Sequence, residues 1–261
     1  MKLLKLVLKY IKYYITSKAK YSIQGPFLYE LTTQVIKKRI TNKSIDQIET
    51  LRKKLFRSEK EIEITDFGAG SKINRSKKRK IKDIAKNSSK NSKFGKLLYK
   101  IVDFYKPKNI IELGTSLGVS ALYLAKASDK AQVFTFEGCP KTAQVAFNNF
   151  KEQDAKNISI ITGNFDSTLT KKLNQIGYID LAFIDGNHTE KATIKYFKQC
   201  LDYSHNNTIF IFDDIHWSKG MEKAWEYIKN HEKTTLTVNL FFVGLVFIKS
   251  ELSKENFTIR F

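Results

Sequence analysis

The stretch Asn109-Ile-Ile-Glu-Leu-Gly-Thr-Ser-Leu-Gly118 decides the fold of this chain. Its first five residues are mostly apolar without a polar alternation, which is typical of a strand buried on both faces of a parallel sheet. Gly114 and Gly118 then allow a tight turn, and the apolar residues beyond them predict a helix over residues 118–127. A strand, a glycine turn and a helix in this order predict the first unit of a strand–helix repeat.

The same alternation continues beyond this stretch. Strands are predicted at 133–137, 158–162, 179–185 and 208–213, with helices at 139–153, 168–176 and 189–203 between them. Further helices are predicted at 94–105 and 219–230, and strands near 235–240 and 243–249 follow without a helix between them. The sequence therefore predicts an α/β fold with a Rossmann-like, doubly wound, mostly parallel sheet. We expect it to end in an antiparallel hairpin and to follow a basic helical N-terminal extension.

Nearly all of the net charge of +20 lies in the first hundred residues, which hold 27 Lys and Arg against 8 Asp and Glu. Such a segment suits an anionic partner such as lipid headgroups, nucleic acid or an acidic glycan. With 42% hydrophobic residues and only 3 Pro in 261 residues, the chain is not a disordered one. Two Cys and four His at scattered positions give neither a disulfide framework nor a zinc-ligand spacing. No uncharged apolar run reaches the roughly 18 residues that span a bilayer, so we expect a cytoplasmic protein.

Residues 1–20 are predicted to form a basic amphipathic helix. Lys2, Lys5, Lys9 and Lys12 recur at helical spacing and share one stripe, and apolar residues cover the rest. Two interpretations stay open. The helix packs on its own domain or on a second subunit in a homodimer, or it docks peripherally on the inner membrane surface.

Residues 21–93 are predicted to form a basic helical and loop extension, with two short helices between 29 and 57 and a substrate lid as one role. The glycine-rich segment 66–71 lacks the context of a kinase or a nucleotide-binding turn, so it is interpreted as a loop near the mouth of the active site. The basic cluster 77–80 is either a solvated face or a contact for an anionic substrate or nucleic acid. The predicted boundaries are therefore 1–20, 21–93 and 94–261.

Polar residues follow every strand of the predicted parallel sheet, at the edge where α/β proteins bind ligands. They are Glu112 with the loop Gly114, Thr115, Ser116 and Gly118; Glu137 and Gly138; Gly163, Asn164 and Phe165; Asp185 and His188; and Asp213, Asp214 and His216. The G-x-x-x-G spacing differs from the G-x-G-x-x-G of dinucleotide sites, which argues against a nicotinamide enzyme. Glu137 stands where a carboxylate accepts hydrogen bonds from a ribose diol.

Taken in order, these motifs resemble the class I S-adenosylmethionine-dependent methyltransferases, in particular the catechol-type O-methyltransferases, over roughly residues 94–261. The resemblance implies S-adenosylmethionine as the cofactor. Its amino-acid end would be held by Glu112, Gly114, Thr115, Ser116 and Gly118. Its ribose would lie at Glu137 and Gly138, its adenine near Gly163, Asn164 and Phe165, and Asp185 would be a further contact.

The catechol-type enzymes also hold a divalent metal with an Asp after the fourth strand and an Asp-Asn pair after the fifth. The resemblance places Asp185, Asp213 and Asp214 in those roles, three oxygen ligands suited to Mg²⁺, although Asp214 replaces the Asn. Where those enzymes have a lysine that takes the substrate proton, this chain has His188, and imidazole can accept a proton near neutral pH. The candidate catalytic residues are thus His188, Asp185, Asp214 and His216, the last lining the substrate pocket.

The function implied is O-methylation of a small-molecule or glycan-like hydroxyl, with metal assistance as an open point. Two alternatives stay open. One is an RNA methyltransferase that uses the basic N-terminal region, although the Asn/Asp-Pro-Pro-aromatic loop of base amino-group methylation is absent. The other is a non-catalytic scaffold at a membrane surface, against which the strand-end acids argue.

Overall fold

The computed structural model describes residues 2–18, 25–65, 78–88 and 91–261, which fall into two compact units. The central unit holds residues 39–176, and the terminal unit joins residues 1–38 to residues 177–261. This division joins the two ends of the chain in one unit. The boundaries predicted from sequence stay predictions, and the glycine-rich segment 66–71 lies outside the described residues.

The central unit contains three parallel strands in the order β3-β4-β5. They are β3 (Asn109–Leu113), β4 (Gln132–Glu137) and β5 (Ile158–Thr162), and the helices α6 (Val119–Ala125), α7 (Pro140–Glu152) and α8 (Phe165–Ile176) follow them in turn. The apolar residues of β3 are buried, as a strand between two helical layers requires. Helix α8 begins three residues before the predicted position, because the Asn164 side chain accepts the N–H of Asp166 at 2.8 Å and starts the first turn.

The N-terminal part of the central unit contains two predicted helices and three elements that the sequence did not predict. Helix α3 (Lys43–Leu55) lies in the segment 29–57, for which two short helices were predicted, and α5 (Ser92–Tyr105) covers the helix predicted at 94–105. The unpredicted elements are α4 (Ile81–Ser88) and the strands β1 (Glu61–Glu63) and β2 (Lys78–Lys80), which pair antiparallel. The predicted basic cluster therefore lies largely on a strand, apart from Lys77, which is outside the described residues. Lys80 pairs with Glu59 at 3.0 Å, and Lys82 pairs with the same carboxylate. Strands of three residues give too short a pattern to be read from sequence.

The terminal unit contains five strands in the order β10-β8-β9-β7-β6. They are β6 (Ile179–Ile184), β7 (Ser204–Asp213), β8 (Leu236–Asn239), β9 (Val243–Phe247) and β10 (Glu255–Thr258). Strands β6 and β7 are parallel, and β8 and β9 form the predicted antiparallel hairpin. The short strand β10, which was not predicted, pairs parallel with β8.

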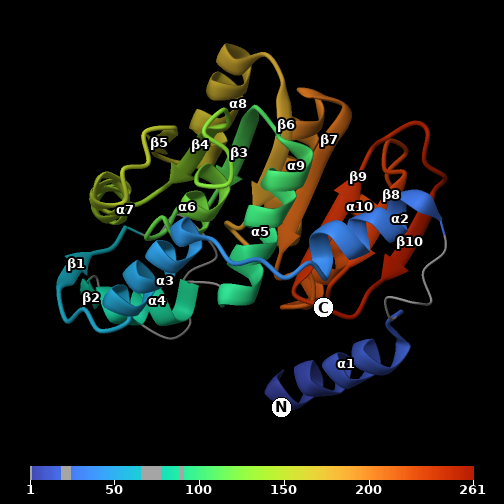
Figure 1. The fold of residues 1–261 in the computed structure, drawn as a ribbon, viewed down its shortest axis with the longest axis horizontal. Coiled ribbons are helices and arrows are strands. Elements are labelled where there is room, and N and C mark those ends of the chain that lie inside the picture. The colour runs from blue at the N-terminus through green and yellow to red at the C-terminus, as the bar shows by residue number, and fades with distance from the viewer. Residues whose placement is uncertain (1, 19–24, 66–77, 89–90) are drawn as a thin grey trace. The chain divides into compact units, whose positions relative to one another are not determined.

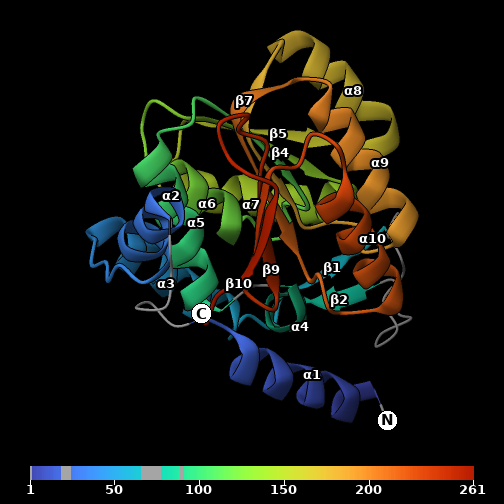
Figure 2. The same ribbon diagram turned by 90° about the vertical axis from the view of Figure 1, so that its right-hand side faces the viewer.

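Helices cover both faces of these five strands. Helices α9 (Glu190–Leu201) and α10 (Lys219–Asn230) lie side by side on one face (Figure 2), where the Phe197 ring contacts Phe210 and Phe212. Helix α2 (Pro26–Glu30), continued by a π-helical turn (Leu31–Ile36), lies on the other face (Figure 1), with the rings of Phe27 and Phe247 5.0 Å apart. Strands β6, β8 and β9 and the second half of β7 are thus buried, as their apolar sequences predict.

The two ends of the chain meet in the terminal unit. Helix α1 (Lys2–Thr16) is held by Tyr13, whose buried hydroxyl donates to the Ile259 carbonyl at 2.6 Å and accepts the Phe261 N–H at 3.0 Å. Lys18 forms a parallel β-bridge with Ile259. Among the described residues, no helix combines the length and apolar character needed to cross a membrane.

The predicted α/β class, with a mostly parallel sheet and a terminal antiparallel hairpin, is confirmed, whereas the basic helical N-terminal extension stays a prediction. The strands are mostly parallel, helices alternate with them, and the hairpin follows the last predicted helix.

Candidate functional site

The glycine loop after β3 belongs to the central unit and is held by backbone geometry that only small residues allow. Gly114 and Gly118 have φ of 109° and 83°, and Ser116 has φ of 47°. A Cβ on Gly118 would lie 2.4 Å from the Phe150 ring, so this position requires glycine for space as well as for conformation. The N–H groups of Gly114 and Thr115 both donate to the Phe136 carbonyl at 3.0 Å, which fastens the loop to β4.

Glu112, at the end of β3, is fully buried. Its Oε2 accepts from the Thr135 hydroxyl at 2.5 Å, and Thr135 and Thr115 share a hydroxyl contact of 2.6 Å. Its other oxygen, Oε1, is buried and lacks a hydrogen bond of normal geometry. Burial raises the pKa of this carboxyl to about 7, hydrogen bonds from Ser120 and Thr135 oppose the rise, and the charge of Glu137 adds to it. A buried carboxyl group that ionises near pH 7, and that has one oxygen without a normal hydrogen bond, suits a cationic group of a ligand.

Glu137, at the end of β4, connects two loops. Its carboxylate accepts the Ser116 N–H at 2.8 Å and the Cys139 N–H at 2.9 Å, one on each oxygen. Gly138 lies between Glu137 and Cys139, and Gly163 donates its N–H to the Glu137 carbonyl at 2.9 Å. The structure thus joins the predicted ribose-binding acid to the glycine loop, which sequence spacing alone did not indicate.

The segment after β5 starts helix α8. The Asn164 side chain caps this helix, and the Phe165 ring contacts Phe136 edge-to-face with centroids 6.3 Å apart. Asn164 was predicted to lie near the adenine, and the structure gives its side chain a helix-capping role. Phe165 is half-buried at the end of the same three strands.

Two contacts from the N-terminal part of the central unit reach these loops, and sequence reasoning missed both. The Ser88 hydroxyl at the end of α4 lies 2.7 Å from the Ser116 hydroxyl. The Cys139 thiol accepts the Thr65 N–H at 3.3 Å just beyond β1. Neither Ser88 nor Thr65 belongs to a motif, so no signal in the sequence could have found them. The two contacts flank Glu137, because Ser116 and Cys139 are its backbone donors.

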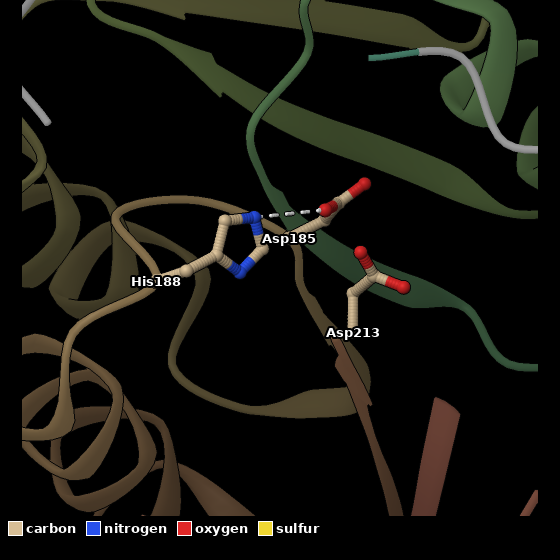
Figure 3. A group of neighbouring side chains, drawn as sticks. All are labelled: Asp185, His188 and Asp213. Atoms are coloured by element: carbon tan, nitrogen blue, oxygen red, sulfur yellow. Dashed lines mark ion pairs between the residues drawn. The ribbon is translucent and has the colours of Figure 1, made fainter. Parts of the chain in front are cut away.

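The terminal unit brings together Asp185, His188 and Asp213 (Figure 3). Asp185 follows β6, Asp213 ends β7, and one donor atom from each of the three residues lies within 4.8 Å of the others. His188 Nε2 is 3.5 Å from Asp185 Oδ1, and Asp213 is fully buried. Ligands of one small divalent cation bind it at about 2.0–2.2 Å, so a small movement of these side chains would let them share an ion.

Asp214 does not belong to that group of three, although the sequence grouped it with Asp185 and Asp213 as an oxygen ligand. Its backbone adopts a φ of 54°, and its carbonyl accepts the Trp217 N–H at 2.9 Å. The structure places His188 beside the two aspartates instead. Asp214 lies just beyond the end of β7 in a left-handed backbone conformation, so the alternation of side chains along the strand does not determine its direction.

His216 contacts other side chains of the terminal unit. Its Nε2 lies 3.0 Å from Asn239 Nδ2, and its Nδ1 lies 3.5 Å from the Glu222 carboxylate, to which Lys9 donates at 2.5 Å. Burial lowers the pKa of His216, although Glu222 and Asn239 oppose the change. Its ring lies beside Phe241, with centroids 5.3 Å apart.

The chain is similar in sequence and fold to known methyltransferases. The family described as "Methyltransferase domain" matches residues 111–215. A catechol O-methyltransferase of Niastella koreensis is 31% identical over 124 residues, which are 46% of this chain and 55% of that protein. The chain thus matches about half the length of this curated relative.

Two solved structures have the same fold. An O-methyltransferase of Streptomyces achromogenes involved in tomaymycin synthesis, in complex with S-adenosylmethionine, has a TM-score of 0.57 at 15% identity and covers 85% of this chain and 95% of its own. An O-methyltransferase of Bacillus cereus in complex with S-adenosylhomocysteine has a TM-score of 0.52 at 19% identity, with 84% and 96% covered. At this identity the likeness establishes the fold. Residues 111–215 therefore match a methyltransferase-domain family, and the chain has the Rossmann-like α/β fold of these O-methyltransferase structures.

Proposed function

We propose that this chain is an S-adenosylmethionine-dependent O-methyltransferase that methylates a hydroxyl group of a small-molecule acceptor. The matched domain, the catechol O-methyltransferase relative and the cofactor-bound structural neighbours support the proposal. S-adenosylmethionine, when bound, would supply a sulfonium methyl group, which passes to a nucleophilic oxygen as the carbon–sulfur bond breaks and the thioether S-adenosylhomocysteine leaves. The protein's own tasks are then to bind, to align and to remove a proton.

The observation that carries the proposal is the state of Glu112. A fully buried carboxyl with a pKa of about 7 and an oxygen lacking a normal hydrogen bond fits the ammonium of the cofactor's amino-acid end. A cation beside Glu112 would stabilise its ionised form and supply the missing donor. Gly114, Thr115, Ser116 and Gly118 would let the backbone approach the same end of the cofactor.

Glu137 would accept the ribose hydroxyls. Its two hydrogen bonds from backbone N–H groups fix the orientation of the carboxylate before the ligand arrives. Gly138 would allow close approach beside it, and Gly163, Asn164 and Phe165 would border the adenine. The half-buried Phe165 ring offers an apolar face for that base.

In the terminal unit, Asp185 and Asp213 would hold a divalent cation, which would supply Lewis-acid chemistry toward the acceptor hydroxyl. Mg²⁺ fits two carboxylates and Asp214 as a third oxygen donor, whereas an imidazole among the donors also suits Mn²⁺, Fe²⁺ or Zn²⁺. Asp185 orients the His188 ring across 3.5 Å. Because Nε2 faces Asp185, we assign to His188 Nδ1 the acceptance of the acceptor's hydroxyl proton, and to His216 a wall of the substrate pocket.

Calorimetric titration with S-adenosylmethionine and S-adenosylhomocysteine tests the cofactor assignment. We expect micromolar binding that Glu137→Ala weakens at least about tenfold, because the variant loses a charged hydrogen-bond acceptor. Glu152→Gln, an exposed acid at the end of α7, is the matched control and should bind as the wild type does. A folded wild-type protein that binds neither compound would refute the proposal.

The metal assignment has a separate readout. Titration with Mn²⁺ followed by electron paramagnetic resonance should show one site that Asp213→Asn removes. His188→Gln then separates two roles. If His188 accepts the proton, the variant should bind Mn²⁺ as the wild type does, and its rate of methyl transfer should fall by about 10²-fold or more. If the variant loses Mn²⁺ binding, His188 is a metal ligand, which contradicts its assignment as the base.

A further inference from the structure

Helix α1 is attached to the terminal unit through one side only. Tyr13 is buried and hydrogen-bonds Ile259, and Lys9 pairs with Glu222. The Tyr10 ring packs edge-on against Phe241 with centroids 5.0 Å apart. These contacts fix the orientation of the helix, so its remaining side faces outward in a defined way.

The outward side of α1 is apolar. Its exposed side chains, with their exposed fractions, are Val7 45%, Leu8 58%, Ile11 46%, Tyr14 49% and Ile15 72%. At 3.6 residues per turn, these five fall within about 120° of the helix circumference. Of the twelve large hydrophobic side chains that are exposed in the described part of the chain, six lie on α1. Contiguous exposed patches of this kind mark interaction sites.

The charged residues of the helix itself are all basic, and Lys9 among them pairs with Glu222. The chain has no Asp or Glu before Glu30, and six Lys precede it. Lys12 and Lys18 are exposed, and the Arg260 guanidinium stacks on the Tyr14 ring at 4.1 Å. An apolar stripe bordered by lysines and tyrosines is complementary to an anionic lipid surface, where acyl chains meet negative headgroups.

We propose that α1 docks on an anionic lipid bilayer, lying in the plane of its surface. The outward stripe enters the boundary of the acyl chains, and the lysines remain at headgroup level. A helix of 15 residues is about 22 Å long, which suits a helix lying on the surface. A second copy of this chain fits less well, because pairing two such faces would bring like charges together.

Vesicle sedimentation of the full chain tests this proposal. We expect binding to phosphatidylcholine vesicles that contain phosphatidylglycerol, and weak binding to phosphatidylcholine alone. The double variant Leu8→Ser/Ile15→Ser should lower the partition coefficient at least about tenfold. Lys12→Gln should lower it about fivefold, and raising the salt concentration should reduce the difference.

Phe147→Ser is the matched control, because Phe147 is 44% exposed on α7 in the central unit. It should bind vesicles as the wild type does. All the substituted side chains are exposed, so thermal unfolding midpoints should match that of the wild type. Equal binding to neutral and anionic vesicles, or binding that the double variant does not change, would overturn the proposal. So would a dimer seen by analytical ultracentrifugation, without vesicle binding, that the double variant dissociates.

Discussion

Replacing Glu112 by Gln should make the folded protein more stable above neutral pH while weakening its binding of the cofactor. The Glu112 carboxyl is fully buried, and its pKa is raised from 4.5 to about 7. The unfolded chain releases this proton near the ordinary value, whereas the folded chain keeps it until about pH 7. The contribution of the protonated Glu112 to the free energy of unfolding is therefore complete below pH 4.5 and is lost as the pH rises through 7.

The size of the effect follows from the shift. A difference of about 2.5 pKa units corresponds to about 3 kcal/mol, of which about 2 to 3 kcal/mol is lost between pH 5 and pH 8. Gln cannot ionise, and its amide oxygen can still accept from Thr135. Glu112→Gln should therefore remove this part of the pH dependence and exceed the wild type in stability at pH 8.

Urea unfolding of both proteins at pH 5 and pH 8 measures the difference, with Glu152→Gln as the exposed control. Calorimetry with S-adenosylhomocysteine should show about ten- to hundredfold weaker binding by Glu112→Gln, since a charged acceptor for the ammonium is lost. If the variant keeps the wild-type loss of stability between pH 5 and pH 8, the burial of Glu112 does not control its ionisation and the reasoning fails.

Three further outcomes are expected. Gly118→Ala should destabilise the protein by about 1–3 kcal/mol and abolish cofactor binding, because its Cβ would meet the Phe150 ring at a φ of 83°; an unchanged melting temperature would contradict this. The wild type should lose stability as the pH falls below 6.5, because its buried His216 has a lowered pKa and resists protonation, and His216→Gln should not show this part of the loss; curves of unfolding free energy against pH that run parallel for variant and wild type would contradict this prediction. Tyr13→Phe should lower the free energy of unfolding, measured with urea, by about 1–2 kcal/mol, because the hydroxyl hydrogen-bonds the Ile259 carbonyl; an unchanged free energy would mean that this hydrogen bond does not hold α1.

Most of the repeating strands and helices could be predicted because each depends on local pattern. Strands β3 and β5 have the predicted bounds, since a run of apolar residues between turns needs no distant information. Helix α10 likewise begins and ends where the sequence predicts. The short elements β1, β2 and β10 were missed, because three or four residues give too little periodicity to distinguish a strand from a loop.

The candidate residues could be predicted as a list but not as an arrangement. The resemblance to the catechol-type enzymes assigned Asp185, Asp213 and Asp214 as oxygen ligands. The tertiary structure also brings His188 beside the first two. The turn after β6 and the φ of 54° at Asp214 decide which side chains meet, and a pattern of residue types does not specify such angles.

By itself, the sequence determined the α/β class, the alternation of elements and the acids at the strand ends, because these follow from hydrophobic periodicity and chain direction. Only the tertiary structure decided that α1 packs through Tyr13 against Ile259, and that Glu137 accepts N–H groups from Ser116 and Cys139. Tyr13 and Ile259 are 246 positions apart. Contacts over such separations form only when the whole unit packs, since their energy depends on many side chains fitting together at once.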